Sequence, residues 1–180
     1  MKARLALLLI CAAATFAGCA SLDAQQRKWI FQPSDRSWWG GAQSAEGMND
    51  VWIEFASVHE RQGGNPHGLG LPQTDVEAPV MLYLHGARWD VRSSAPRMRG
   101  MHDLGFSVLG IDYRGFGQSS DGLPSEDRMH DDALAAWQWL ARERPQASRY
   151  LYGHSLGAAI AVRVASETRA AAGVIVEGGF

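Results

Sequence analysis

The sequence predicts an α/β fold with a doubly wound, mostly parallel sheet. From about residue 51 onward, short apolar runs alternate with stretches of helical periodicity, which is the pattern of repeated strand–helix units. Several of these runs are apolar at every position, as expected for parallel strands that are covered on both faces. A third indication is a G-x-S-x-G motif at 153–157, which lies between a strand-like run and a helix-compatible run.

The elements are predicted in order along the chain. Strands are expected at 51–55, 68–72, 79–84, 106–111, 149–152 and 173–177, the last of them buried; helices are expected at 94–105, 125–145 and 158–165. Ser125 is expected to cap the second helix, and Pro145 to end it. The apolar stripe of that helix is Met129, Ala133, Ala136, Trp137 and Leu140.

The first 50 residues divide into two further segments. Residues 1–18 resemble a lipoprotein-type signal, with Lys2 and Arg4 ahead of an apolar stretch that ends in small residues before Cys19. Lipidation at Cys19 would anchor the protein to a membrane of the cell envelope, and Ser21 suits the outer membrane; the alternative is an ordinary secretory signal and a secreted or periplasmic protein. Residues 19–50 are expected to be an irregular lead-in whose aromatic residues pack over the domain formed by residues 51–180; these are Trp29, Phe31, Trp38 and Trp39.

Composition excludes several classes of function. Cys11 and Cys19 are the only cysteines, and Cys11 lies within the predicted signal, so we expect neither an internal disulfide nor a thiolate metal cluster in the mature chain. A net charge of −2 gives no reason to expect a nucleic-acid partner. We find no phosphate-binding glycine loop and no metal-ligand spacing, so no cofactor or metal is predicted. The oligomeric state is not indicated.

The G-x-S-x-G motif predicts a nucleophile elbow, in which Ser155 is lifted off the sheet by a tight turn; the alternative is a serine that caps a helix. Gly153 and Gly157 are expected where a side chain would collide with the neighbouring helix or strand. A serine nucleophile also needs donors for its oxyanion. His85-Gly86-Ala87 follows the central strand, so the backbone N–H groups of Ala87 and Leu156 are the expected donors, with His85 orienting the loop.

Three motifs occur in the order and spacing of the α/β-hydrolase superfamily, namely Leu82-Tyr83-Leu84-His85-Gly86, the segment 112–119 (DYRGFGQS) and Gly153-His154-Ser155-Leu156-Gly157. More narrowly, residues 51–180 resemble bacterial serine aminopeptidase S33-type hydrolases, which are related to lysophospholipase-like proteins. The resemblance implies an esterase, lipase, thioesterase or aminopeptidase-like enzyme that acts on a small-molecule or lipid-like acyl substrate through an acyl-enzyme at Ser155. It also implies that Asp112 and Arg114 are structural, with the Asp112 carboxylate held by nearby amides and by Arg114; the alternative for Asp112 is a role in the catalytic triad.

The sequence departs from the family pattern after Ser155. The family's triad acid and base follow the nucleophile, yet neither histidine nor aspartate occurs in residues 156–180. Glu177 is the one well-placed acid in that stretch, and a pocket-lining role is the alternative for it. The side chain of His154 is expected to point away from that of Ser155. His130 lies beside Asp131 and Asp132 and is expected in a solvated charge cluster. His59, His67 and His102 are expected in turns or on helix surfaces.

We therefore expect the chain to be the N-terminal part of a longer hydrolase, with the acid and base beyond residue 180 and little activity in this part alone. An apolar strand at the edge of the sheet, expected at 173–177, supports the same interpretation. The alternative is a non-catalytic, membrane-anchored lipoprotein that keeps the fold as a binding module.

Overall fold

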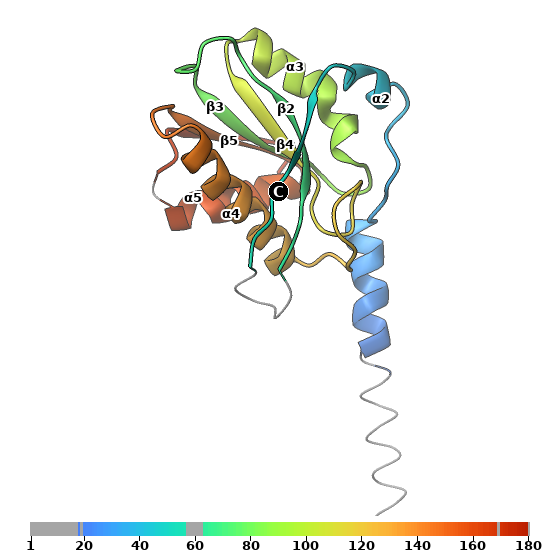
Figure 1. Cartoon of the computed structure of the whole chain (residues 1–180). Coiled ribbons are helices and arrows are strands. Elements are labelled where there is room, and N and C mark those ends of the chain that lie inside the picture. Colours follow the sequence, from blue (N-terminus) through green and yellow to red (C-terminus); the bar gives the residue numbers. More distant parts are fainter. Residues whose placement is uncertain (1–17, 19, 57–62, 169, 180) are drawn as a thin grey trace, which may run out of the picture.

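The computed structural model describes residues 18, 20–56, 63–168 and 170–179 (Figure 1). Most of the predicted signal, together with Cys19 and His59, lies outside these residues, so the signal and the lipidation site remain predictions. Among the described residues, no helix combines the length and apolar character needed to cross a membrane.

A six-stranded sheet forms the centre of the molecule. Its strands are β1 (Asn49–Trp52), β2 (His67–Leu71), β3 (Val80–Leu84), β4 (Ser107–Ile111), β5 (Arg149–His154) and β6 (Gly173–Glu177), in the spatial order β1-β2-β4-β3-β5-β6. β3, β4, β5 and β6 pair in parallel, whereas β1 and β2 join the edge beside β4 in antiparallel pairs. This mixed, mostly parallel sheet confirms the predicted α/β class.

Helices cover both faces of the sheet (Figure 1). α4 (Glu126–Glu143) and α5 (Leu156–Thr168) pack together on one face, and α3 (Ala95–Asp103) lies on the other with the short helix α2 (Gly41–Ser44) and the 3-10 turn η1 (Val91–Ser94). α4 begins as predicted, because the Ser125 hydroxyl accepts a hydrogen bond of 3.2 Å from the Arg128 amide.

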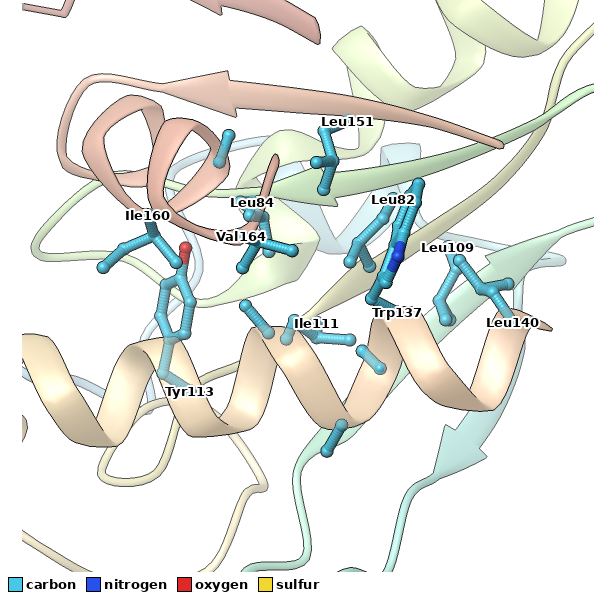
Figure 2. Close-up of a cluster of buried hydrophobic side chains, with 14 of the residues drawn as sticks. Leu82, Leu84, Leu109, Ile111, Tyr113, Trp137, Leu140, Leu151, Ile160 and Val164 are labelled. Atoms are coloured by element: carbon cyan, nitrogen blue, oxygen red, sulfur yellow. The ribbon is translucent and has the colours of Figure 1, made fainter. Parts of the chain in front are cut away.

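Alternation along β3 divides the core between the two faces. Val80, Leu82 and Leu84 pack toward α4 and α5, whereas Met81 and Tyr83 pack toward α3. The predicted stripe of α4 is fully buried, and Figure 2 shows Trp137 and Leu140 of that stripe against side chains of the sheet. Because β3 and β4 are covered on both sides, all five residues of each strand are buried, as predicted.

Two burial predictions were wrong. β6 is parallel to β5 and lies at the edge of the sheet within the described chain, both as expected. It is not buried, however: Val174, Ile175 and Val176 keep 39%, 40% and 50% of their surface exposed, because only β5 pairs with the strand there. The lead-in, expected to be irregular, forms a helix over residues 20–31 (Figure 1), and of its four aromatic residues only Phe31 is buried. The three tryptophans remain exposed, with Trp29 at 70%, Trp38 at 51% and Trp39 at 90%.

The predicted solvated cluster around His130 was also wrong. His130, Asp131 and Asp132 are at most 4% exposed, because this side of α4 faces the core of the domain. The loop after β4 inserts Arg114, whose amide and Nε each donate a 2.8 Å hydrogen bond to Asp132. His130 lies 3.0 Å from Glu167 of α5. A buried charge is tolerated here because it is paired.

Candidate active site

Ser155 lies on the turn between β5 and α5. Its φ of +53° is in the left-handed region, which a residue other than glycine adopts only when its surroundings impose it. The turn is held by the Ser155 amide, which donates to the Glu177 carbonyl at 2.8 Å, and by the Ser155 carbonyl, which accepts from the Ala158 amide at 3.0 Å. The strand–turn–helix context of the motif is therefore as the sequence predicted.

The two motif glycines lie where backbones approach closely. A Cβ on Gly153 would lie 2.6 Å from the Ala158 Cα, and one on Gly157 would lie 2.7 Å from the His85 carbonyl oxygen. Real Cβ atoms do not come this close to backbone, so either substitution would force α5 away from the sheet. The glycines let the helix that follows Ser155 pack directly against β5 and the end of β3.

The loop after β3 lies against the elbow. A Cβ on Gly86 would be 3.1 Å from the Ser155 Cβ, so the backbone of this loop runs beside the serine. Within the described residues, the amides of Ala87 and Leu156 donate no hydrogen bond, whereas the next amide, that of Arg88, donates to the Phe31 carbonyl at 3.0 Å. Leu156 is the first residue of α5, where helix N–H groups lack intrahelical acceptors.

A cavity of about 620 Å³ opens at this place. Its lining includes Ser155, His154 and the whole segment from His85 to Asp90. The lead-in and the stretch from η1 to the start of α3 contribute further side chains, which the sequence did not place at the site; these are Gln32, Trp38, Ser93, Ser94, Pro96 and Arg97. The cavity thus combines the lead-in, the loop after β3, the start of α3 and the elbow. Arg88 and Trp89, which directly follow the oxyanion loop, border it.

Glu177 lies at the end of β6, where its carboxylate is already engaged. Arg97 of α3 donates from Nε and Nη2, each at 3.0 Å, and the Tyr152 hydroxyl donates a short hydrogen bond. These contacts lower the pKa of Glu177 to about 2, with Arg97 as the main cause. His154 lies 4.0 Å away through Nε2, and its pKa is lowered by burial and by Arg97. No local sequence pattern indicated Arg97, because α3 reaches this point only through the tertiary fold.

His85 belongs to a buried polar network behind the oxyanion loop. Its Nδ1 is 2.6 Å from the Gly86 carbonyl oxygen, and its Nε2 is 3.4 Å from Asp112 Oδ1. Asp112 also accepts a 2.7 Å hydrogen bond from the Val91 amide and lies 3.5 Å from His67. Burial alone would raise the pKa of Asp112, but His67, His85 and the Val91 amide lower it below its ordinary value.

Two expectations about this network need correction. Asp112 is tied to an amide as expected, but its side-chain partners are histidines, since Arg114 is directed to Asp132. His67, expected in a turn, is 1% exposed on β2 and also contacts Asp50 of β1 at 2.7 Å. Although burial would lower the pKa of His67, Asp112 and Asp50 raise it above its ordinary value.

The described residues provide neither a metal centre nor a base for Ser155. Among them, no group of three His, Cys, Asp or Glu side chains is arranged to hold a metal ion. Within the same part of the chain, no histidine or carboxylate forms a hydrogen bond with the Ser155 hydroxyl. What this arrangement offers is a hydroxyl on a constrained turn, two amide donors from separate segments and a cavity beside them.

Comparison with known proteins points to one family. Residues 76–180 match the family model described as serine aminopeptidase, S33. A human protein, ABHD12B, is 37% identical over 140 residues, which cover 76% of this chain and 32% of that protein. The rat lysophosphatidylserine lipase ABHD12 is 31% identical over 130 residues, which cover 71% of this chain and 27% of the lipase.

Solved structures share the fold. An esterase from Pyrococcus furiosus superimposes with a TM-score of 0.67 at 21% identity, over 82% of this chain and 56% of the esterase. The chain spans between about a quarter and a half of the length of the curated relatives it matches. With the family model matching more than half of the chain and the fold in agreement, the chain belongs to the serine aminopeptidase S33 family of α/β-hydrolases, related to the ABHD12 lipases.

Proposed function

We propose that this protein is a serine hydrolase that cleaves lipid-like esters through an acyl-enzyme on Ser155. The observation that carries the proposal is the position of Ser155, which lies on a turn with φ of +53° at the wall of a cavity and beside the glycine loop of β3. A helix-capping serine would not require that backbone conformation, because N-cap residues have β-region dihedrals.

The reaction follows from this geometry. The Ser155 oxygen attacks the ester carbonyl carbon while a base takes the hydroxyl proton, and the carbonyl oxygen becomes an oxyanion. The amides of Ala87 and Leu156 are proposed to donate to that oxyanion, because within the described chain they have no other acceptor. The alcohol leaves with a proton from the same base, and water then hydrolyses the acyl-enzyme.

The base and its acid are proposed to come from a longer form of the protein. Two observations support this: the chain covers only part of its relatives, and Glu177 is held by Arg97 and Tyr152 rather than by a histidine. Removing triad members costs several orders of magnitude in rate but leaves the contribution of the oxyanion hole. The 180-residue chain alone is therefore expected to react slowly.

The substrate class is proposed from the cavity and from the relatives. The ABHD12 relatives are lysophosphatidylserine lipases, and an acyl ester of a lipid has both an apolar chain and a polar head. The cavity offers apolar surface from Trp38, Trp89 and Pro96, and a cation from Arg88. This combination suits such an amphipathic ester.

A fluorophosphonate probe tests the nucleophile, because it forms a covalent bond only with an activated serine. We expect the longer form to be labelled, Ser155→Ala to abolish labelling, and Ser166→Ala, on the exposed side of α5, to leave it unchanged. The second candidate, a non-catalytic binding module, is favoured by the lack of a base on Ser155 among the described residues. Absence of labelling in the longer form would reject the hydrolase in favour of that module.

A further inference from the structure

We propose that the rim of the Ser155 cavity docks on an anionic lipid bilayer. The docking surface consists of Lys28, Arg36, Trp38, Trp39, Arg88 and Trp89, and is called the rim patch below. The inference rests on the proposed function for its purpose, which is to bring lipid esters to Ser155. The docking itself can be measured without any hydrolysis.

The aromatic part of the rim patch is exposed where packing was expected. Trp39 is 90% exposed, Trp38 is 51% exposed and Trp89 is 37% exposed. Trp38 and Trp89 line the mouth of the Ser155 cavity, and Trp39 follows Trp38 in the chain. Tryptophan is enriched at membrane interfaces, because its ring is amphipathic and sits at the level of the headgroups. Two exposed tryptophans that line the cavity, with a third next to one of them in the chain, therefore indicate contact with a bilayer.

The basic part of the rim patch borders the same cavity. Lys28, Arg36 and Arg88 line a second groove of about 630 Å³, which shares Arg88, Trp89 and Gln32 with the Ser155 cavity. Within the described residues, none of these cations has a carboxylate within salt-bridge distance, and the Arg88 Nε donates instead to Gln32 Oε1 at 3.1 Å. Asp35 lines the groove as well, which leaves an excess of two positive charges.

Arg88 is held in place between the two hollows. Its φ of +84° lies in the left-handed region, and its amide is bound by the Phe31 carbonyl at 3.0 Å. Backbone strain of this kind persists only where the surrounding structure imposes it, and it concentrates at functional positions. The backbone of Arg88 is thus held in place, and the hydrogen bond from its Nε to Gln32 Oε1 keeps its guanidinium beside another residue of the cavity lining.

The charges of the rim patch indicate which kind of partner binds it. Unpaired cations beside exposed tryptophans match a surface with negative headgroups above an apolar layer, whereas a protein partner would need carboxylates opposite each cation. A bilayer also supplies the acyl esters that the proposed reaction consumes. We therefore assign the rim patch to an anionic membrane surface rather than to a protein or to a second copy of the chain.

Co-sedimentation with vesicles tests the docking. The full chain carrying Cys19→Ser, which removes any lipid anchor, is mixed with phosphatidylcholine vesicles with and without phosphatidylglycerol. Affinity for the anionic vesicles is expected to fall roughly fivefold for Lys28→Gln and for Arg36→Gln, since each surface cation contributes that much. Trp39→Ser is expected to weaken binding to both kinds of vesicle. The leader is the same in every variant, so ratios between variants report only the rim patch.

Matched controls come from the opposite end of the sheet. Arg142→Gln, in the last turn of α4, and Leu104→Ser, at an apolar residue that is 72% exposed beside the start of β4, are expected to leave vesicle binding unchanged. Equal affinities for the rim variants and the unsubstituted chain would overturn the proposal. Self-association that Trp39→Ser abolishes, without vesicle binding, would overturn it in favour of a contact between copies.

Fluorophosphonate labelling in vesicle-free solution separates this proposal from the proposed function. Labelling of the longer form without any binding to anionic vesicles overturns the docking and leaves the hydrolase. Vesicle binding that depends on the rim patch, without labelling, supports the docking and rejects the hydrolase.

Discussion

At the scale of single residues, the turn at Ser155 depends on two neighbouring positions that carry no side chain. The serine itself has an unfavourable φ of +53°, and the space around it exists because Gly153 and Gly157 have no side chains. This part of the site could be predicted from the sequence, because a nucleophile elbow is encoded within five consecutive residues. The position of Leu156 follows from the same motif, whereas that of Ala87 follows from its place in the loop after the apolar run of β3.

Gly157→Ala is expected to lower the free energy of unfolding by about 1–3 kcal/mol, the usual cost of overpacking. The added Cβ would lie 2.7 Å from the His85 carbonyl oxygen, and backbone cannot yield as a flexible side chain does. Urea denaturation measures the change. The matched control is Gly100→Ala inside α3, where a Cβ meets nothing within 4 Å, so the same substitution should stabilise by about 0.5–1 kcal/mol. Equal effects at the two sites would contradict this account.

The residues that the sequence did not place are polar groups whose burial depends on distant segments. His67, His130 and Asp132 are charged or titratable types, which are exposed in most proteins, so a solvated position was the natural expectation. Each is buried because a partner from another element reaches it. A local sequence pattern does not predict such a partner, because the two residues are far apart in the chain. Arg114 precedes Asp132 by 18 residues, and Asp50 precedes His67 by 17.

At the scale of elements, burial on both faces made β3, β4 and α4 predictable. A strand covered on both sides must be apolar at every position, and a helix on a sheet must carry one apolar stripe. β6 shows the limit of this reasoning. Its sequence is that of a covered strand, but within the described chain only β5 pairs with it, so its apolar side chains stay partly exposed.

Trp137→Ala is expected to destabilise the protein by about 3–5 kcal/mol, as for other large core side chains. Trp137 is 2% exposed, and it fills the space between α4 and the sheet with Leu82 and Leu109 nearby (Figure 2). The Arg149 guanidinium lies over its ring at 4.9 Å and adds a cation–π contact. Urea denaturation gives the cost, and Trp39→Ala is the control, because that side chain is 90% exposed. A cost below about 1 kcal/mol for Trp137→Ala would show that α4 is not packed as described.

At the scale of the whole molecule, the candidate site is a product of topology. Parallel strands bring the loops after β3, β4 and β5 to one end of the sheet, so Gly86, Asp112 and Ser155 meet there. The sequence predicted this gathering, because ligand sites of open α/β sheets lie at the carboxyl ends of the strands. It did not predict that the lead-in would add Gln32 and Trp38, because the path of the chain after the helix at 20–31 depends on contacts with distant segments, such as the hydrogen bond from the Arg88 amide to the Phe31 carbonyl.

The chain of contacts from Asp50 through His67 and Asp112 to His85 joins four segments, and it predicts a pH-dependent stability. The pKa of His67 is raised in the folded protein, so its contribution is complete below the unfolded value of about 6.5 and is lost as the pH rises through the folded pKa. His67→Gln should therefore lower the free energy of unfolding more at pH 6 than at pH 9. Urea denaturation of both proteins at the two pH values measures this difference.

The other histidines are the same in both proteins, so their contributions cancel in the comparison. They include His130 and His154, whose pKa values are lowered and whose contributions to stability change with pH in the opposite direction. Asp50→Asn is the companion variant: it removes one of the two carboxylates and should bring the His67 titration, followed by NMR, to a lower pH. A cost of His67→Gln that is equal at both pH values would mean that the network holds a neutral imidazole.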